Sequence, residues 1–69
     1  METTLMEVFS LEEGDQIIQQ GNVYRITDMD NNPEGGIDIY CVDEEGFKRV
    51  IYAVGPMDKV RLVVEDDTL

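Results

Sequence analysis

Carboxylates are the side chains with the most chemical potential in this sequence, which has 16 Asp and Glu against five Lys and Arg and no His. Nucleophilic catalysis needs a Ser or Cys beside a base, and the usual base near neutral pH is His. The lone Cys41 alternates with Ile37 and Ile39, where a thiol packs as a small apolar group. Paired carboxylates catalyse only in a cleft that perturbs their pKa values. We therefore expect neither an enzyme nor a cofactor.

The segment between Asp28 and Glu34 has the spacing of a calcium loop, with oxygen-bearing side chains at alternate positions. In an EF-hand loop, however, Pro33 would replace the sharp-turn glycine and Ile39 the bidentate glutamate. Asn and Asp also supply ordinary turn chemistry. We expect a polar hairpin loop with no metal. Its four candidate ligands are Asp28, Asp30, Asn32 and Glu34.

The negative charge is unevenly distributed along the chain. Residues 1–46 contain twelve acids and one base, whereas residues 47–69 contain four of each. Such a surface keeps a small protein soluble and excludes DNA, RNA and anionic membranes as direct ligands. A second interpretation is nucleic-acid mimicry. Acids two apart on a strand, such as Asp28 and Asp30, project from one face about 6.6 Å apart, near the spacing of successive phosphates.

A third interpretation is binding of a protein partner through exposed tyrosines. Tyr24, Tyr40 and Tyr52 do not all fit a core of this size, and interfaces are enriched in Tyr. Alternation places Tyr40 opposite Ile39 and Cys41, so we expect it outside. The candidate partner-binding residues are Tyr24, Tyr40, Asp28, Asp30, Glu34, Asp43, Glu44 and Glu45.

Short runs rich in Val, Ile and Tyr, separated by turn residues, predict strands. The apolar strand at 60–64 offers an edge for self-association. The segment 4–13 fits a helix or an extended chain equally well. The five predicted strands are Gln16–Gln19, Val23–Met29, Ile37–Val42, Phe47–Val54 and Lys59–Val64.

Five short antiparallel strands are most economically arranged as a small barrel. The runs LEEGDQI at 11–17, GNVYRI at 21–26 and DKVRLV at 58–63 resemble the first, second and closing strands of SH3-like barrels. Short phage-encoded proteins and the KOW-like and elongation-factor-P-like translation modules share this pattern. The resemblance implies an all-β, five-stranded antiparallel SH3-like barrel.

We therefore expect a barrel at 11–64, a flexible segment at 1–10 and an acidic tail at 65–69. No apolar run approaches the roughly 18 residues of a membrane span, and no signal peptide is evident, so we expect a cytoplasmic protein. The predicted function is a non-enzymatic acidic interaction module, of the kind phages and mobile elements encode, that binds a host or virion protein. The alternative is a nucleic-acid mimic that inhibits a basic DNA- or RNA-binding protein.

Overall fold

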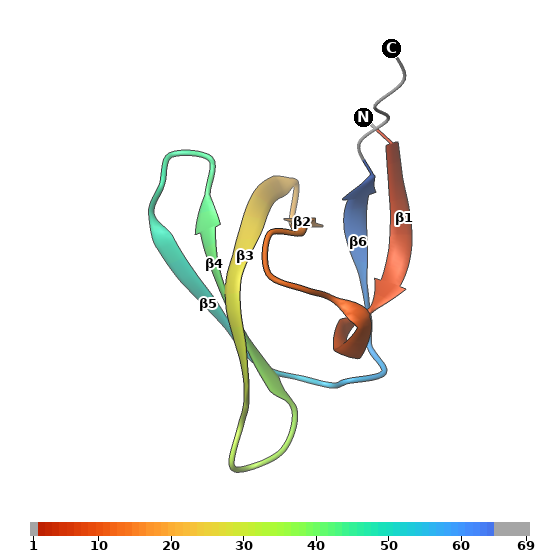
Figure 1. Ribbon diagram of the computed structural model, residues 1–69, viewed down its shortest axis with the longest axis vertical. Coiled ribbons are helices and arrows are strands. Elements are labelled where there is room, and N and C mark those ends of the chain that lie inside the picture. Colours follow the sequence, from red (N-terminus) through yellow and green to blue (C-terminus); the bar gives the residue numbers. More distant parts are fainter. Residues whose placement is uncertain (1, 65–69) are drawn as a thin grey trace.

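The protein is an all-β domain of six strands, as described by a computed structural model for residues 2–64 (Figure 1). A short 3-10 helix, η1 (Val8–Ser10), is the one helical turn among these residues. The predicted tail at 65–69 lies outside the described residues. The strands are β1 (Glu2–Glu7), β2 (Gln16–Gln19), β3 (Asn22–Asn31), β4 (Ile37–Asp43), β5 (Lys48–Val54) and β6 (Lys59–Val64).

The six strands form one antiparallel sheet in the order β1-β6-β2-β3-β4-β5. The all-β class is confirmed, but the prediction of five strands closed into a barrel is wrong, because the sheet is open with β1 and β5 at its edges. The last strand, β6, pairs with β2 on one side as a barrel would require. Its other side is occupied by β1, so the sheet is extended there.

The sixth strand comes from residues 1–10, the segment expected to be flexible and outside the barrel. Six residues of β1 pair with β6, and the Val8 N–H donates to the Asp58 carbonyl at 2.9 Å. Val8 is completely buried. The open question at 4–13 is thus resolved as strand followed by a single 3-10 turn. The expected self-association edge at 60–64 is also wrong, since β6 lies between two strands.

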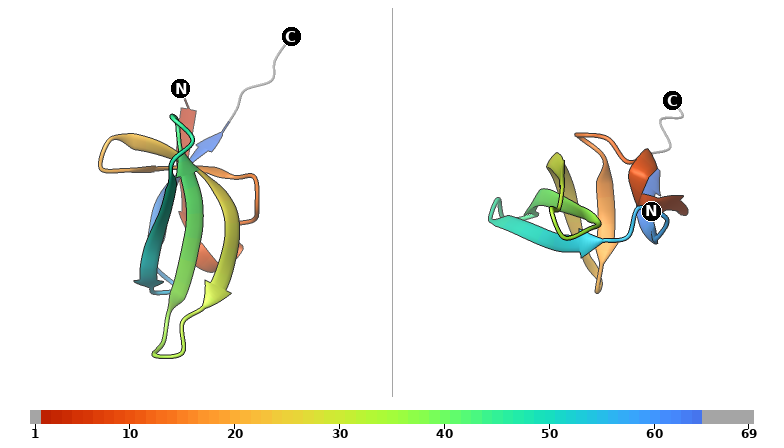
Figure 2. Two further views of the ribbon diagram at one scale, coloured as in Figure 1. Left: turned by 90° about the vertical axis from the view of Figure 1, so that its left-hand side faces the viewer. Right: turned by 90° about the horizontal axis from the view of Figure 1, so that it is seen from below.

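The core lies on the inner face of the curved sheet (Figure 2). As predicted, Ile39 and Cys41 belong to the inward set. Burial of such side chains stabilises the fold by about 1.5–3 kcal/mol each. The buried apolar cluster consists of Val8, Leu11, Ile17, Ile26, Ile39 and Val60.

Two irregularities set which side chains face outward. In β3, the pairing with β4 shifts between Ile26 and Asp28, which leaves Thr27 as a bulge. In β5, the pairing shifts between the partners of Ile37 and Ile39, and Ala53 there has a φ of 55°. Extra residues of this kind bend a strand and change the direction of the side chains that follow.

The short connections fall in the gaps between the predicted strands. Gln20 and Gly21 both have positive φ and join β2 to β3 as a two-residue turn, and Gly46 with φ 89° ends the β4–β5 turn. Within residues 2–64 no helix is long and apolar enough to span a membrane.

Candidate functional site

The eight predicted partner-binding residues fall into three separate places in the structure. We define the Tyr40 cluster as the groups on β3, β4 and β5 that surround Tyr40. The Tyr24 cluster is the group at the β4–β5 turn. Glu34 lies apart, exposed in the β3–β4 loop. The Tyr40 cluster consists of Tyr40, Asp28, Asp30, Asp38 and Tyr52, and the Tyr24 cluster of Tyr24, Asp43, Glu44, Glu45 and Arg49.

The bulge at Thr27 places Asp28 and Asp30 beside Tyr40. Before the bulge Ile26 faces the core, and strict alternation would turn Asp28 inward as well. The extra residue reverses this, so Asp28 is exposed opposite Tyr40, and Met29 packs against the core. The Thr27 hydroxyl secures the bulge by donating to the Tyr40 carbonyl at 3.2 Å.

A hollow of about 430 Å³ lies over this part of the sheet. Tyr40 and Val42 of β4 line it together with Lys48 and Val50 of β5 and Asp28 of β3. Tyr40, Val42 and Val50 are half-buried, whereas Asp28 and Lys48 are exposed. The hollow therefore has an aromatic and aliphatic floor with an acid on one side and a base on the other.

The Tyr40 hydroxyl stands in a negative field. Partial burial raises the pKa of Tyr40 above its usual value of 10.0, and the charges of Asp38, Asp30 and Asp28 raise it further, with a contribution from Tyr52. Each of these groups disfavours a phenolate on Tyr40. Asp38 and Tyr52 were not among the predicted site residues. Asp38 lies two residues before Tyr40 on β4, and Tyr52 lies two residues after Val50, the β5 partner of Tyr40.

Asp28 and Asp30 also accept hydrogen bonds from backbone N–H groups on the unpaired side of β3. Strand β2 pairs with β3 only as far as Arg25, so the later part of β3 has no strand beside it on that side. There the Asp28 carboxylate accepts from the Met29 N–H at 2.8 Å, and the Asp30 carboxylate accepts from the Asn31 N–H at 3.1 Å. Within residues 2–64 neither carboxylate has a Lys or Arg nitrogen within 4.0 Å. Their charge is therefore uncompensated locally.

Asp38 has a structural role beneath this surface. Its Oδ1 accepts from the Ala53 N–H at 2.9 Å and from the Asn32 side-chain amide at 3.0 Å. The residue is 8% exposed, the one buried charged residue among those described. It joins the β5 bulge to the β3–β4 loop. This loop begins later than the polar loop predicted at 28–34, because residues 28–31 belong to β3.

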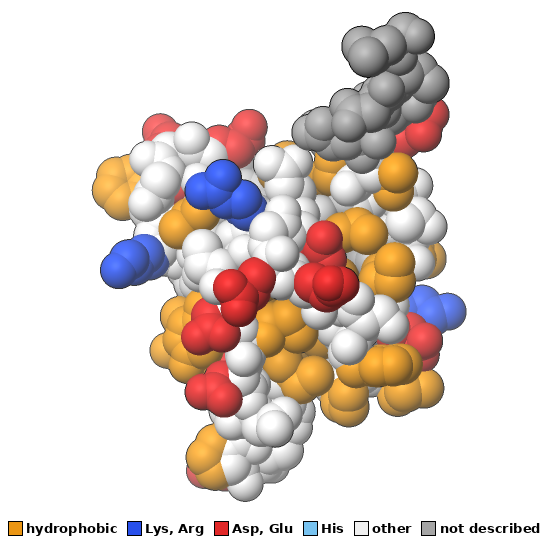
Figure 3. All heavy atoms as spheres, viewed as in Figure 1, with side chains coloured by type: hydrophobic (Ala, Val, Ile, Leu, Met, Phe, Trp, Pro, Cys, Tyr) orange, Lys and Arg blue, Asp and Glu red, His pale blue; other side chains and the backbone are white. Residues whose placement is uncertain are grey.

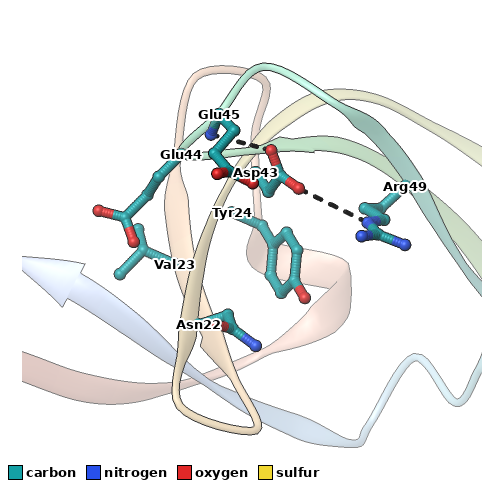
Figure 4. Close-up of a pocket in the computed structure, with 7 residues that line it drawn as sticks. All are labelled: Asn22, Val23, Tyr24, Asp43, Glu44, Glu45 and Arg49. Atoms are coloured by element: carbon teal, nitrogen blue, oxygen red, sulfur yellow. Dashed lines mark hydrogen bonds and ion pairs between the residues drawn. The ribbon is translucent and has the colours of Figure 1, made fainter.

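In the Tyr24 cluster, the charge of Asp43 is compensated by hydrogen bonds and an ion pair within the chain (Figure 4). Asp43 Oδ1 accepts from the backbone N–H groups of Glu45 and Phe47, both at 2.9 Å, and Oδ2 lies 3.6 Å from Arg49 Nε. Tyr24 packs partly against the core, and its ring lies beside the Asp43–Arg49 ion pair. Glu44 is exposed and points away from the ring. Asp43 therefore holds the turn together, and a cavity of about 360 Å³ remains beside it.

The calcium-loop spacing does not produce a ligand cluster. No group of three or more His, Cys, Asp or Glu residues that could hold a metal is found in residues 2–64. Asn32 Oδ1 instead accepts from the Glu34 N–H at 2.8 Å, in the manner of an Asx turn.

Cys41 is buried in the inward set, with its Sγ 3.6 Å from the Arg49 carbonyl. Burial raises the pKa of the Cys41 thiol, and the nearby Asp43 raises it further, while Arg49 acts in the opposite direction. This environment favours the neutral thiol over the reactive thiolate.

Neither a scan against protein-family models nor a search of the curated proteins gives a match for this chain. The surface of the chain itself is therefore the guide to its function.

Proposed function

We propose that this protein is a non-enzymatic interaction module that binds a basic segment of a partner protein on the Tyr40 cluster. The observation that carries the proposal is the position of Tyr40 beside an apolar hollow and next to two exposed carboxylates, Asp28 and Asp30, that no Lys or Arg of residues 2–64 pairs with. An aromatic ring next to carboxylates is suited to an Arg or Lys side chain, because the cation contacts the ring face and pairs with the acids.

The rest of the surface supports a basic partner. In Figure 3, acidic side chains gather along β3, near the loop before β2 and at the β4–β5 turn, and they outnumber the basic side chains on this face. The chain carries a net charge of −11, which speeds encounter with a positively charged protein. The half-buried floor of Tyr40, Val42 and Val50 adds apolar contact area that salt does not screen.

The alternative function is mimicry of a nucleic acid. One observation favours it: Asp28 and Asp30 lie on the same face of β3, and each is held by the same bond to the following N–H. A row of equally oriented carboxylates could occupy a groove that normally binds phosphates. Binding by mimicry rests on many exposed ion pairs, so salt should abolish it.

The test is capture from a bacterial lysate with the tagged full chain, washed at about 0.15 M and at about 0.5 M salt. The Tyr40→Ala variant removes the ring, and a second variant, Asp28→Asn with Asp30→Asn, removes two charges. The matched control, Glu44→Gln with Glu45→Gln, removes two charges from the Tyr24 cluster.

We expect a partner that survives the higher salt and is lost with Tyr40→Ala but retained by the control. A basic nucleic-acid-binding protein that is lost in the salt wash and unaffected by Tyr40→Ala would instead indicate mimicry. A partner lost equally with the control variant would contradict both assignments of the surface.

A further inference from the structure

The two edge strands of the sheet run in directions that allow them to pair with each other. The sheet has six strands that alternate in direction, so its two edge strands, β1 and β5, run in opposite directions. They lie on opposite sides of the molecule in Figure 1. Because the number of strands is even, a second copy can continue the sheet with its β5 antiparallel to β1 and with the same face outward.

The backbone groups of β1 that point outward can be identified from its pairing. The Val8 N–H donates to the Asp58 carbonyl, on the β6 side. The N–H and C=O groups of successive residues point to opposite sides of a strand. The N–H and C=O groups of Met6 and Thr4 therefore also point toward β6. Glu7, Leu5 and Thr3 therefore present their N–H and C=O groups at the free edge. The side chain of Leu5 is on the outer face and 55% exposed.

The same reasoning applies to β5. The Asp43 N–H donates to the Phe47 carbonyl, which therefore points toward β4. By the same alternation, the N–H and C=O groups of Arg49 and Ile51 also point toward β4, where these residues pair with Cys41 and Ile39. Lys48, Val50 and Tyr52 therefore present their backbone groups at the free edge, and Tyr52 is 70% exposed.

Registers two residues apart all satisfy direction, hydrogen bonding and side-chain face together, and the charges select one of them. In it the outward backbone groups of β1 face those of β5, and the inner-face residues of both strands also meet. The charges of the two strands agree with this register, because Glu7 then lies opposite Lys48. The hydrogen-bonded pairs are Glu7 with Lys48, Leu5 with Val50 and Thr3 with Tyr52.

We propose that this protein assembles head to tail with copies of itself, with β1 of one copy pairing antiparallel to β5 of the next. The occupant of each edge is a second copy, because the β5 edge carries Lys48 and Arg49 while the β1 edge carries Glu2 and Glu7. A head-to-tail contact uses two different surfaces, so it closes into a ring or grows into a filament. Copies joined this way present their Tyr40 clusters on one continuous face.

The experiment is sedimentation velocity of the full chain at about 0.15 M salt, up to roughly 1 mM protein. We expect the average mass to rise with concentration beyond a dimer. Glu7→Lys and Lys48→Glu each place like charges across the contact, and each should weaken association about tenfold. Glu12→Lys, a matched charge change in the exposed loop before β2, should leave association unchanged.

The decisive measurement is an equimolar mixture of the Glu7→Lys and Lys48→Glu chains. Every contact between unlike chains in that mixture joins opposite charges, so we expect association to return to the level of the unmodified protein. A monomer throughout the concentration range would overturn the proposal. So would a dimer that responds to only one of the two substitutions, since it would pair β1 with β1 or β5 with β5.

Thermal unfolding of each variant separates this contact from folding. If a charge variant unfolds at a lower temperature, Leu5→Pro takes the place of Glu7→Lys and Val50→Pro that of Lys48→Glu. Each proline removes a backbone N–H that faces outward and pairs with no strand within residues 2–64. Loss of association with either proline variant, at unchanged melting temperature, would support the assignment, and full association with both would contradict it.

Discussion

The Tyr40 cluster and the Tyr24 cluster both place a tyrosine among carboxylates, but within residues 2–64 only the Tyr24 cluster contains a carboxylate paired with a cation of the same chain. At the β4–β5 turn, Asp43 is consumed by two backbone donors and an arginine. On the outer face of β3 and β4, Asp28 and Asp30 have no Lys or Arg nitrogen within 4.0 Å among residues 2–64, and their charges add to the effect of burial in raising the pKa of Tyr40. An acidic residue is therefore a better candidate for partner binding where no cation of its own chain pairs with it.

The largest expected contrast between the two regions concerns glycines at the turns next to them. Gly36 and Gly46 have nearly equal φ values of 87° and 89°. A Cβ on Gly36 would lie 2.8 Å from the Ala53 backbone carbon, whereas a Cβ on Gly46 meets nothing within 4 Å. We expect Gly36→Ala to lower the free energy of unfolding by about 3 kcal/mol and Gly46→Ala by about 1 kcal/mol. Urea unfolding measures both free energies of unfolding. Equal losses would show that the β5 backbone at Ala53 shifts to accommodate the added methyl group.

The next contrast compares the structural carboxylates. Asp38→Ala leaves the Ala53 N–H, which points into the sheet, without its acceptor, so we expect a loss of about 2 kcal/mol. Asp43→Ala frees two donors at an exposed turn, where water can replace the carboxylate, so we expect about 1 kcal/mol. Equilibrium unfolding measures which of the two substitutions lowers the free energy of unfolding more. A greater loss for Asp43→Ala would mean that the turn governs the stability of the sheet.

The third contrast is the titration of Tyr40. Asp28→Asn with Asp30→Asn should lower the raised pKa of Tyr40, because two of the charges that disfavour its phenolate are removed. Glu44→Gln with Glu45→Gln should leave this pKa unchanged. Ultraviolet difference spectra, compared with those of Tyr40→Phe, isolate the Tyr40 signal. Equal shifts in both double variants would show that the whole acidic surface, rather than the local carboxylates, sets the pKa.

The same shift predicts a pH dependence of stability. The folded protein holds the Tyr40 proton to a higher pH than the unfolded chain does, so the unfolded chain binds fewer protons above about pH 10. The stabilisation from Tyr40 is complete below that pH and is lost as pH rises through the folded pKa. Tyr40→Phe should remove this part of the alkaline loss, as measured by unfolding at pH 9 to 11.

The smallest effect concerns Ala53, which has a φ of 55° at the bulge over Asp38. Glycine adopts this conformation without strain, so we expect Ala53→Gly to raise the free energy of unfolding by about 0.5 kcal/mol. Ala53→Asn, which also tolerates positive φ, is the matched comparison. A loss of stability in both variants would show that the Ala53 methyl group packs more favourably than its strain costs.

Much of the fold could be read from local patterns. The strands at 16–19 and 59–64 have the predicted bounds, and the inward direction of Ile39 and Cys41 follows from alternation. The bulge at Thr27 could have been found from one signal: the core residues Ile26 and Met29 are three apart, which a regular strand does not allow. The site was harder to predict, because Asp28 and Tyr52 come close to Tyr40 through strand pairing, although Asp38 shares a face with Tyr40 by simple alternation along β4.

From the sequence alone, five of the six strands and the turns between them could be located, as could the concentration of acids in the first two thirds of the chain. These properties depend on neighbours along the chain, through the two-residue period of a strand and the conformations open to glycine. Only the tertiary structure decided that β1 pairs with β6, that the sheet stays open, and which carboxylates keep an uncompensated charge. Those outcomes depend on partners distant in sequence, since a strand's period does not specify which strand it joins.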